Sequence, residues 1–462
     1  MKRLLIAAPA SGNGKTTVCA GIIAALVGRG LKVAPFKVGP DYIDPTYHAL
    51  AAGQTCHNLD PWLLPPERIV ASFAQRSRSA DIAIIEGMMG LFDGLSGSDD
   101  SGSGADIARL LAVPVVLVLD VSAMARSAAA VVRGFRDFDP RVRIGGVILN
   151  RVGGATHARM VQEAIEVETG VPVLGYLPQE DAFHLPERHL GLIPTAEPGR
   201  WQSWVESVGR SVEQHIDLQR LLEIAECGAL AQPVSNSASP FIHQTTAKRA
   251  RIAVAYDAAF NFVYQDNLDL LQAAGAEIAL FSPLNDQELP SGTQALYLCG
   301  GFPELYAEQL ADNVSMHSQI QQAYVRGLPI YAECGGLMYL THAILDIHNK
   351  SHSMVGLLPG RAVMGQRLTL GYRTLQVLAD NWLWKAGESL RGHEFHYSTW
   401  RGRTSNLPFL YEFQPDAYRL TPELEGVWHG SLIASYTHLH FLAKPELATR
   451  FVAAASGVQQ LS

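Results

Sequence analysis

A glycine-rich loop close to the N-terminus constrains the fold of this chain more than any other feature. A short apolar run over residues 3–8 leads into the loop, PASGNGKTT at residues 9–17, and a helix is predicted over residues 16–28. A strand that passes through such a loop into a helix is the arrangement of a phosphate-binding P-loop, although Pro9 stands where the motif has its first glycine. The sequence therefore predicts a parallel α/β sheet whose first strand ends at an anion-binding helix terminus.

The types of residue in this loop suit a bound nucleotide. Glycine at positions 12 and 14 allows backbone N–H groups to turn toward a phosphate, and the Lys15 ammonium reaches the β- and γ-phosphates. The Thr16 hydroxyl is a ligand for Mg²⁺. The predicted nucleotide-binding residues of the loop are Gly12, Asn13, Gly14, Lys15, Thr16 and Thr17.

Strand-like and helix-like segments alternate along the chain, which indicates βαβ units and mostly parallel sheets. Apolar runs with β-branched residues predict strands over residues 81–86, 113–120, 142–150, 251–256, 295–298 and 329–333, and an alanine-rich stretch predicts a helix over 123–134. Residues 229–249 are polar and contain two prolines, a composition typical of a linker. We expect two doubly wound α/β domains, over residues 1–228 and 250–462, joined by a linker over 229–249.

Acidic side chains follow two of the predicted strands near the phosphate loop. Lys37, Asp41 and Asp44 lie in the segment KVGPDYIDP, and Glu86 and Asp93 lie in EGMMGLFDG. Open α/β sheets hold Mg²⁺ with carboxylates at such strand ends, so we expect Asp41 and Glu86 to bind the metal and Lys37 to face the nucleotide. The alternative is that the acids cap helices or turns, and which of Asp41, Asp44 and Asp93 contacts metal rather than substrate stays open.

Asn150 ends the predicted strand 142–150, on the side of the sheet where the phosphate loop is expected. Its side-chain amide is suited to reading the adenine edge through paired hydrogen bonds. An asparagine at a strand end is equally typical of a turn.

The segment LPIYAECGGLMYL at residues 328–340 predicts a nucleophilic cysteine. A strand ends at Cys334 and a helix begins at once, while Ala332 and Gly336 leave the steric room that a nucleophile elbow needs. A helix N-terminus lowers the pKa of a thiol, so we expect a raised thiolate fraction at Cys334. The alternative is an inert buried cysteine.

Two glycines are candidate donors for an oxyanion hole beside this cysteine. Gly335 follows Cys334 directly, and Gly301 lies in the glycine-rich turn at residues 299–304. A backbone N–H from each would face the developing negative charge of a tetrahedral intermediate. Cys299, in the same turn, is expected to be a packing residue.

A cysteine nucleophile needs a base, and the candidates are His438 and His440 in SYTHLHF. Alternation along a strand would put both imidazoles on the same face. The segment RGHEFHYS at residues 391–398 is dense in polar groups that either line the same site or serve the fold.

Composition excludes several classes of function. The net charge of −8 argues against a dedicated binder of nucleic acid or anionic membranes. The five cysteines, Cys19, Cys56, Cys227, Cys299 and Cys334, form no CxxC pair and predict neither a disulfide framework nor a zinc site. The longest apolar run, residues 110–119, is about half the length that spans a bilayer, so we expect a cytoplasmic protein.

Taken together, these segments resemble the cobyrinate a,c-diamide synthase family over nearly the whole chain. The N-terminal half is similar to the dethiobiotin-synthetase-type P-loop fold, and the C-terminal half to a class I glutamine amidotransferase domain of flavodoxin-like fold. The motifs that match in type and order are residues 37–45, 86–94, 300–304, 332–336, 392–398 and 434–441.

The resemblance implies an enzyme that uses ATP, Mg²⁺ and glutamine. Cys334 would hydrolyse glutamine through a γ-glutamyl thioester, with His438 as the base. Ammonia would then displace phosphate from an acyl phosphate that ATP forms on the a and c acetates of cobyrinate. Residues that match positions shaping the family's nucleotide–substrate site are Asp41, Tyr42, Glu86 and Asp93.

One position departs from the pattern of class I amidotransferases. Most of them place a glutamate two residues after the catalytic histidine, where it orients the imidazole. This chain has His440 at that position, and whether His440 orients His438 is left open.

Alternatives from the same and other classes stay open at this level. The macrocycle could be hydrogenobyrinate or nickel-sirohydrochlorin, or the chain could be a cobyric acid synthase, although that family prefers His-Gly-Leu-Phe where residues 438–441 read HLHF. A partitioning-type regulatory ATPase would be non-enzymatic, but it usually has an early loop lysine where this chain has Ala10 and Ser11, and it gives Cys334 no task. The oligomeric state is also open, with a homodimer as one expectation.

Overall fold

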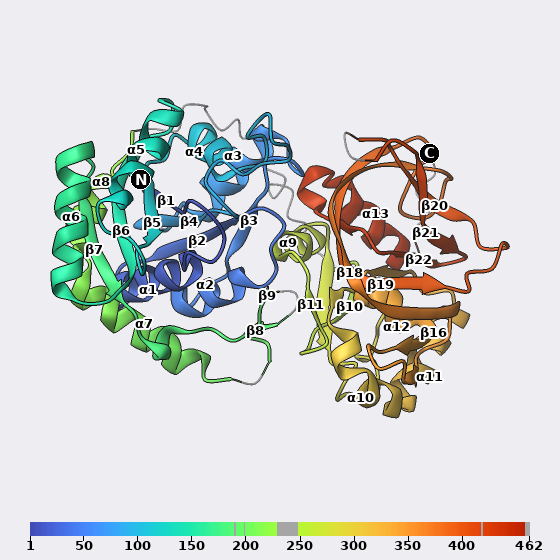
Figure 1. The fold of residues 1–462 in the computed structure, drawn as a ribbon. Helices are drawn as coiled ribbons and strands as arrows, with labels where there is room; N and C mark the ends of the chain where they lie inside the picture. Colours follow the sequence, from blue (N-terminus) through green and yellow to red (C-terminus); the bar gives the residue numbers. More distant parts are fainter. Residues whose placement is uncertain (189–190, 198, 229–247, 417–418, 458–462) are drawn as a thin grey trace. The chain divides into compact units, whose positions relative to one another are not determined.

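The computed structural model describes residues 1–188, 191–197, 199–228, 248–416 and 419–457 (Figure 1). The chain divides into two compact units, Met1–Ser239 and Pro240–Ser462. Of the predicted linker, residues 229–247 lie outside the described residues, and the first strand after it begins at Ala250.

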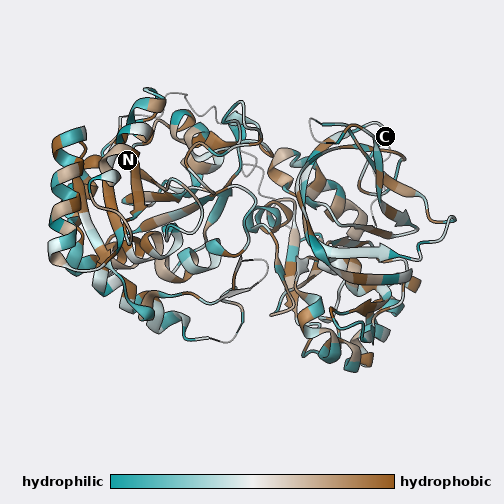
Figure 2. Ribbon diagram, in the orientation of Figure 1, coloured by the Kyte–Doolittle hydropathy of each residue, from teal (hydrophilic) through white to brown (hydrophobic). Residues whose placement is uncertain are grey.

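A parallel sheet forms the centre of the first unit, with the strand order β3-β2-β4-β1-β5-β6-β7. Its strands are β1 (Lys2–Ala7), β2 (Val33–Val38), β3 (His57–Leu59), β4 (Ile82–Glu86), β5 (Val115–Asp120), β6 (Ile144–Val152) and β7 (Val173–Pro178). The central strands are hydrophobic along most of their length (Figure 2), as expected for a sheet that is covered on both faces.

Helices cover both faces of this sheet. They are α1 (Lys15–Gly28), α2 (Asp44–Ala52), α3 (Pro66–Arg76), α4 (Gly104–Leu110), α5 (Ser127–Phe138), α6 (Ala155–Thr169), α7 (Trp201–His215) and α8 (Leu218–Ile224). Helices α1, α2 and α7 lie on one side and α3, α4 and α5 on the other (Figure 1). The helix predicted over 123–134 begins four residues later, because residues 121–126 form turns after β5.

Strand register brings the candidate residues of the first unit together. Strand β4 lies between β1 and β2, and Glu86 at its end is paired with Ile6 on one side and Lys37 on the other. The P-loop leaves β1 at the same edge, and the chain changes direction across the sheet there. Ligands of open α/β sheets bind at such a switch point, outside the carboxyl ends of the strands.

The second unit also has a parallel core, formed by β12, β10, β13, β15 and β22 in that order. These strands are β10 (Ala250–Ala255), β12 (Ala276–Phe281), β13 (Ala295–Leu298), β15 (Ile330–Glu333) and β22 (Leu432–Ser435), and the helices are α9 (Gln265–Ala273), α10 (Ala307–Asp312), α11 (Val314–Val325), α12 (Gly335–Leu340) and α13 (Glu446–Ala455). The connections from β10 and from β13 run in opposite directions across the sheet, so right-handed crossovers place α9 and α11 on opposite faces. The prediction of two doubly wound α/β units is confirmed.

Beyond β22 the same sheet continues with mixed, mostly antiparallel pairing. The additional strands are β16 (Thr341–Leu345), β17 (Ser351–Ser353), β18 (Leu358–Val377), β19 (Ser389–Arg401), β20 (Phe409–Phe413), β21 (Glu423–His429) and β23 (His438–Leu439). Short pairs are formed by β11 (Phe260–Phe262) with β14 (Gly300–Gly301) and by β8 (Glu187–Arg188) with β9 (Gly191–Leu192). Within the described residues, no helix combines the length and the apolar character that crossing a membrane requires.

Candidate active sites

The P-loop has the backbone conformation that its glycines were expected to allow. Gly12 and Gly14 have φ values of 79° and 85°, in the left-handed region that favours glycine. A Cβ on Gly14 would also lie 2.2 Å from the side-chain nitrogen of Asn150, so no other residue fits here without displacing that amide.

Asn150 holds the loop rather than ending a strand. Strand β6 continues to Val152, so the predicted strand end at residue 150 is wrong, and the turn interpretation with it. The buried Asn150 amide donates a hydrogen bond to the Asn13 carbonyl oxygen at 2.8 Å. From the next strand, the Asp120 backbone N–H donates to the Asn13 side chain at 3.1 Å. The two contacts fix the loop against the ends of β5 and β6.

Lys15 begins helix α1 and turns back into the loop. Its ammonium donates to the carbonyl oxygens of Met89, at 2.6 Å, and Ala10, at 3.3 Å. Burial lowers its pKa, against the attraction of Glu86. A phosphate in the loop would replace carbonyl partners by charged oxygens, which are the stronger acceptors. Thr16 and Thr17 follow in the first turn of α1.

A cluster of three carboxylates surrounds one lysine beside this loop. The Lys37 ammonium, which is buried, lies 2.7 Å from an oxygen of Asp44, 3.3 Å from one of Glu86 and 3.6 Å from one of Asp41. The Thr16 hydroxyl donates to the same Glu86 oxygen, Oε1, at 2.9 Å. Hydroxyl and carboxylate oxygens that converge in this way are the donor set that Mg²⁺ prefers.

Two carboxyls of this cluster, Glu86 and Asp44, have opposite pKa shifts. Burial alone would raise the pKa of Glu86, but Lys37 and His48 outweigh it and lower that pKa to about 2. Burial and the neighbouring Asp41 raise the pKa of Asp44 well above its usual value, despite the contact with Lys37. Glu86 is therefore ionised, whereas burial and the acidic neighbours of Asp44 favour its protonated form.

The other predicted acids of this unit also have structural contacts. Asp41 accepts hydrogen bonds from the backbone N–H groups of Ile43, at 2.8 Å, and Asp44, at 3.1 Å, at the start of α2. Asp93 accepts one from the Gly90 backbone at 2.8 Å and closes a turn in the loop after β4. Their capping function is therefore present, and for Asp41 it is combined with a place in the carboxylate cluster. Tyr42, next to Asp41, is buried.

Cys334 has the strained geometry of a nucleophile elbow. It stands between β15 and α12 with φ of 47° and ψ of −103°, a backbone conformation that costs a non-glycine residue about 1–3 kcal/mol. A Cβ on Gly336 would lie 2.2 Å from the Leu298 carbonyl oxygen, so the turn needs a glycine there. A Cβ on Gly335 would lie 3.0 Å from the Gly301 nitrogen, which places the two predicted oxyanion donors side by side.

The expected fall in the pKa of Cys334 is wrong. Burial raises the pKa of the thiol well above its usual value, and Glu304 adds to the effect, whereas the Gly335 N–H opposes it. The sulfur donates a long hydrogen bond, 3.8 Å, to the Phe395 carbonyl oxygen. In the resting protein Cys334 is therefore a thiol, and it needs a base to become a nucleophile.

His438 is held as a neutral imidazole near this cysteine. Burial lowers its pKa to about 3, with a smaller contribution from His396. Its backbone pairs with His393 of β19, and the two rings stack with centroids 5.0 Å apart. A Cβ on Gly300 would lie 2.4 Å from the His438 ring, so the glycine-rich turn makes room for the imidazole. The polar segment 391–398 therefore lines the site, and the buried Cys299 thiol donates a hydrogen bond to the Ala255 carbonyl oxygen.

His440 does not share a strand face with His438 as expected. Strand β23 ends at Leu439, because the chain turns into a 3₁₀ helix at Phe441–Ala443. His440 stacks on Tyr264, and its Nε2 lies 3.9 Å from an oxygen of Asp266. The carboxylate that faces His438 belongs to Glu333, whose Oε2 lies 3.9 Å from the imidazole Nδ1.

Sequence reasoning missed Glu333, although a signal was available. Glu333 is the last residue of β15 and precedes Cys334 directly, and an acid at the buried end of a parallel strand needs an explanation. Tyr331, at 2.6 Å, and Tyr297, at 3.0 Å, donate their hydroxyl protons to its carboxylate, and the Leu439 N–H donates at 3.1 Å. Glu333 thus connects the nucleophile elbow to the strand that carries His438.

Fold and sites together define a class, in which a P-loop nucleotide-binding unit is followed by a glutamine amidotransferase unit; the second unit carries the strained cysteine elbow. Residues 4–193 match the CobQ/CobB/MinD/ParA nucleotide binding domain, and residues 251–446 match the CobB/CobQ-like glutamine amidotransferase domain.

Proteins named cobyrinate a,c-diamide synthase match nearly the whole chain. One from Dehalococcoides mccartyi is 45% identical over 98% of each chain, one from Synechococcus sp. is 44% identical over 99% of each, and one from Methanosarcina acetivorans is 43% identical over 98% of this chain and 95% of its own. The chain belongs to the cobyrinate a,c-diamide synthase family, and the resemblance deduced from the motifs is confirmed.

Proposed function

We infer that this chain is an ATP- and glutamine-dependent amidoligase that converts the a and c acetate carboxylates of cobyrinate into carboxamides. The observation that supports the inference is the presence of two different candidate sites in one chain. The first is a P-loop beside a carboxylate cluster, and the second is a strained cysteine elbow with a neutral histidine. Relatives of this name match both units together.

In the second unit, the side chains are suited to releasing ammonia from glutamine. His438 accepts the proton of the Cys334 thiol as the sulfur attacks the side-chain amide carbonyl, and Gly335 and Gly301 offer N–H donors to the oxyanion. The protonated imidazole then gives its proton to the leaving ammonia, and water hydrolyses the γ-glutamyl thioester. Glu333 is the residue we propose to orient His438 and to stabilise its charged form.

In the first unit, the residues are suited to activating a carboxylate with ATP. Lys15 and the backbone of Gly12–Lys15 bind the phosphates, while Thr16, Glu86 and a carboxylate of Asp41 or Asp44 would hold Mg²⁺. The metal would neutralise phosphate charge during transfer of the γ-phosphoryl group. The substrate acetate attacks that group to give an acyl phosphate and ADP, and ammonia then displaces phosphate to give the amide.

The decisive experiment compares two variants with two nitrogen donors. Cys334→Ala is expected to lose glutamine-dependent amidation and to keep the rate with ammonium salt at mildly alkaline pH, because only the second unit needs the thiol. Lys15→Ala is expected to lose amidation with both donors and to keep glutaminase activity. Formation of the amide from cobyrinate, ATP and Mg²⁺ is followed by mass spectrometry.

A matched control is Cys299→Ala, which removes another buried thiol of the second unit and should keep the glutamine-dependent rate. Glutamine-dependent synthesis by Cys334→Ala would contradict the amidotransferase assignment. Loss of the ammonia-dependent rate in a folded Cys334→Ala protein would contradict the separation of the two sites.

A further inference from the structure

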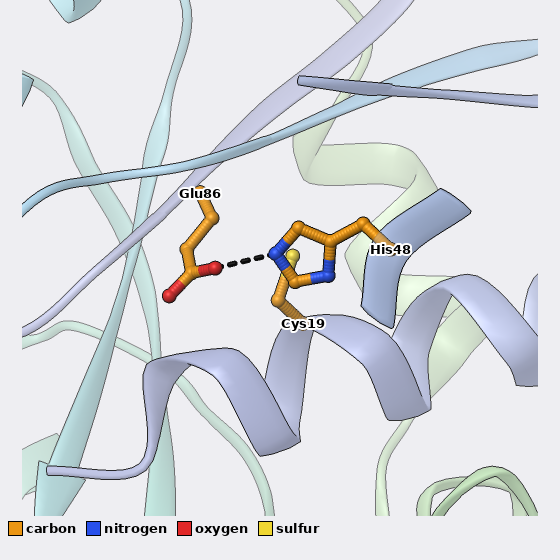
Figure 3. A group of neighbouring side chains, drawn as sticks. All are labelled: Cys19, His48 and Glu86. Atoms are coloured by element: carbon orange, nitrogen blue, oxygen red, sulfur yellow. Dashed lines mark hydrogen bonds and ion pairs between the residues drawn. The ribbon is translucent and has the colours of Figure 1, made fainter. Parts of the chain in front are cut away.

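A second layer of side chains lies behind the carboxylate cluster of the first unit. Cys19 of α1, His48 of α2 and Glu86 of β4 are fully buried, and their polar atoms all lie within 4.8 Å of one another (Figure 3). The imidazole Nε2 of His48 is hydrogen bonded to the Glu86 carboxylate. None of the nucleotide-binding motifs includes Cys19 or His48.

The two oxygens of Glu86 have different partners. Oε1 accepts from the Thr16 hydroxyl at 2.9 Å and lies 3.3 Å from the Lys37 ammonium, so it faces the P-loop. Oε2 is directed to the other side, where it meets only His48 among the hydrogen bonds and ion pairs that the structure describes. The carboxylate is therefore fixed at both ends, and only Oε1 is presented to the nucleotide side.

The hydrogen bond defines which ring nitrogen of His48 donates. An ionised carboxylate is only an acceptor, so Nε2 must carry the proton. Burial alone would lower the pKa of His48, but Cys19 and Glu86 outweigh it and raise that pKa to about 10. Nε2 donates to Glu86 whether or not Nδ1 is also protonated, so the carboxylate is held in both states of the ring.

Helix α2 couples this contact to the rest of the cluster. Asp44 is its first residue and His48 follows one turn later, so the two side chains lie on the same face. Asp44 holds the Lys37 ammonium at 2.7 Å, and His48 holds Glu86. Helix α2 thus positions both the Lys37 ammonium and the Glu86 carboxylate, which meet at Oε1 of Glu86.

We propose that His48 is a positioning residue that fixes the Glu86 carboxylate, so that Oε1 is held ready for Mg²⁺ beside Thr16. The proposal rests on the proposed function, since it assigns Glu86 to the metal of the ATP site. Partners of this kind set the orientation of a ligating carboxylate, and their loss typically weakens metal binding about 10–100-fold. Cys19 is not part of this proposal, because its thiol lies beside His48 and Glu86 but makes no hydrogen bond to the Glu86 carboxylate.

The competing interpretation is that Cys19, His48 and Glu86 form a metal site of their own. Two observations oppose it. His48 and Glu86 are in direct hydrogen-bond contact, which leaves no room for an ion between them. Burial raises the pKa of the Cys19 thiol, so the thiolate that a metal needs is disfavoured.

The test measures binding of Mn²⁺ in the presence of ATP to the full chain, by the electron paramagnetic resonance signal of the free ion. His48→Leu, which cannot donate, is expected to raise the Mn²⁺ dissociation constant about 10–100-fold. His48→Gln places an N–H close to the position of Nε2 and should recover most of the affinity, whereas His48→Asn places it near Nδ1 and should not. Should the leucine variant fail to fold, the glutamine–asparagine pair carries the same comparison.

The matched control is Cys19→Ala, for which we expect an affinity within about twofold of the unaltered chain, since both hydrogen bonds to Glu86 remain. All variants should keep Cys334-dependent glutaminase activity. A folded His48→Leu protein with unaltered Mn²⁺ affinity would overturn the proposal, and so would a Cys19→Ala protein weakened as much as His48→Leu. Mn²⁺ binding requires neither macrocycle nor ammonia, so the result can be read even if the proposed amidation is not found.

Discussion

Two glutamates, Glu86 in the first unit and Glu333 in the second, occupy equivalent places and behave in opposite ways. Each is the last residue of a central parallel strand, and each is buried, with 0% and 1% of its surface exposed. The pKa of Glu86 is lowered to about 2, because Lys37 and His48 outweigh burial. Burial raises the pKa of Glu333 to about 7, since its partners are tyrosine hydroxyls and a backbone N–H. Partners, and not burial, therefore decide whether such an acid is charged.

The difference suits the chemistry that we propose for each unit. A site for Mg²⁺ and phosphates benefits from a carboxylate that stays ionised whether or not the ligand is present, and Glu86 supplies one. A carboxyl that orients a catalytic imidazole needs to become charged when the imidazole is protonated, and a pKa near 7 allows this. The same strand-end position thus serves a permanent charge in one unit and a conditional charge in the other.

The largest effect on the difference between Glu86 and Glu333 is expected when the Lys37 ammonium is removed. Lys37→Met leaves Glu86, Asp41 and Asp44 without their shared partner, and loss of one member of a buried ion pair destabilises a protein by about 3–5 kcal/mol. We expect this loss in the free energy of unfolding of the first unit, measured with a denaturant at pH 7. The loss should shrink at lower pH, because without Lys37 the carboxyl pKa values rise and the acids take up protons in the folded state.

A double variant provides the control for that experiment. Glu86→Gln combined with Lys37→Met removes one uncompensated charge and should recover part of the stability. If Lys37→Met alone leaves the unfolding free energy unchanged, the lysine does not hold Glu86 in its ionised form.

The second prediction concerns Glu333, the carboxyl that is expected to become charged when His438 is protonated. Glu333→Gln keeps the volume but cannot stabilise the imidazolium of His438, so glutaminase activity should fall. We expect about a 100-fold decrease, less than the loss of about 10⁴-fold for a closely bonded orienting aspartate, because the distance here is 3.9 Å. Turnover is measured as glutamate release.

The pH profile of glutaminase activity distinguishes a role of Glu333 toward His438 from a general loss of structure. Glu333 ionises as the pH rises through about 7, so the rate of the unaltered chain should rise between pH 6 and 8. Glu333→Gln should lack this limb of the profile. Glu425→Gln, which alters a half-buried acid of the same unit that hydrogen bonds to Ser435, is the matched control. An unchanged limb in Glu333→Gln would assign the ionisation to another group.

Much of the fold follows from the sequence, because a parallel strand that is buried on both faces leaves a continuous apolar run. The prediction found β1, β4, β5, β6, β10, β13 and β15 within two residues of their ends. It failed where local signals do not decide the boundary. Asn150 lies inside β6 and not at its end, and β23 stops after two residues because the chain turns into a 3₁₀ helix.

The candidate sites were predictable only where a motif carries the chemistry. The P-loop and the cysteine elbow have fixed spacing, so Lys15, Thr16 and Cys334 could be named from the sequence. Glu333 had only the weaker signal of an acid at the end of a buried strand, and His48 had none, since their partners come from strands and helices that are distant in the chain. The pKa of Cys334 was mispredicted for a related reason, because a helix N-terminus is visible in a sequence and complete burial is not.

The last prediction concerns Asn150, whose expected effect is the smallest. In the structure its amide donates to Asn13 within the P-loop, whereas the sequence left open that it reads adenine. Asn150→Ala leaves a loop carbonyl without its hydrogen-bond partner. The binding free energy of ATP should weaken by about 1–2 kcal/mol, which corresponds to an increase in the KM for ATP of about 5–30-fold. If the variant acts through the loop geometry, it should weaken the binding of ATP and of GTP equally, because both nucleotides present the same phosphates. A loss confined to ATP would mean that the amide reads the base. Arg143→Ala, just before the start of β6, should leave both KM values unchanged, and ammonia-dependent amidation measured with each nucleotide separates these outcomes.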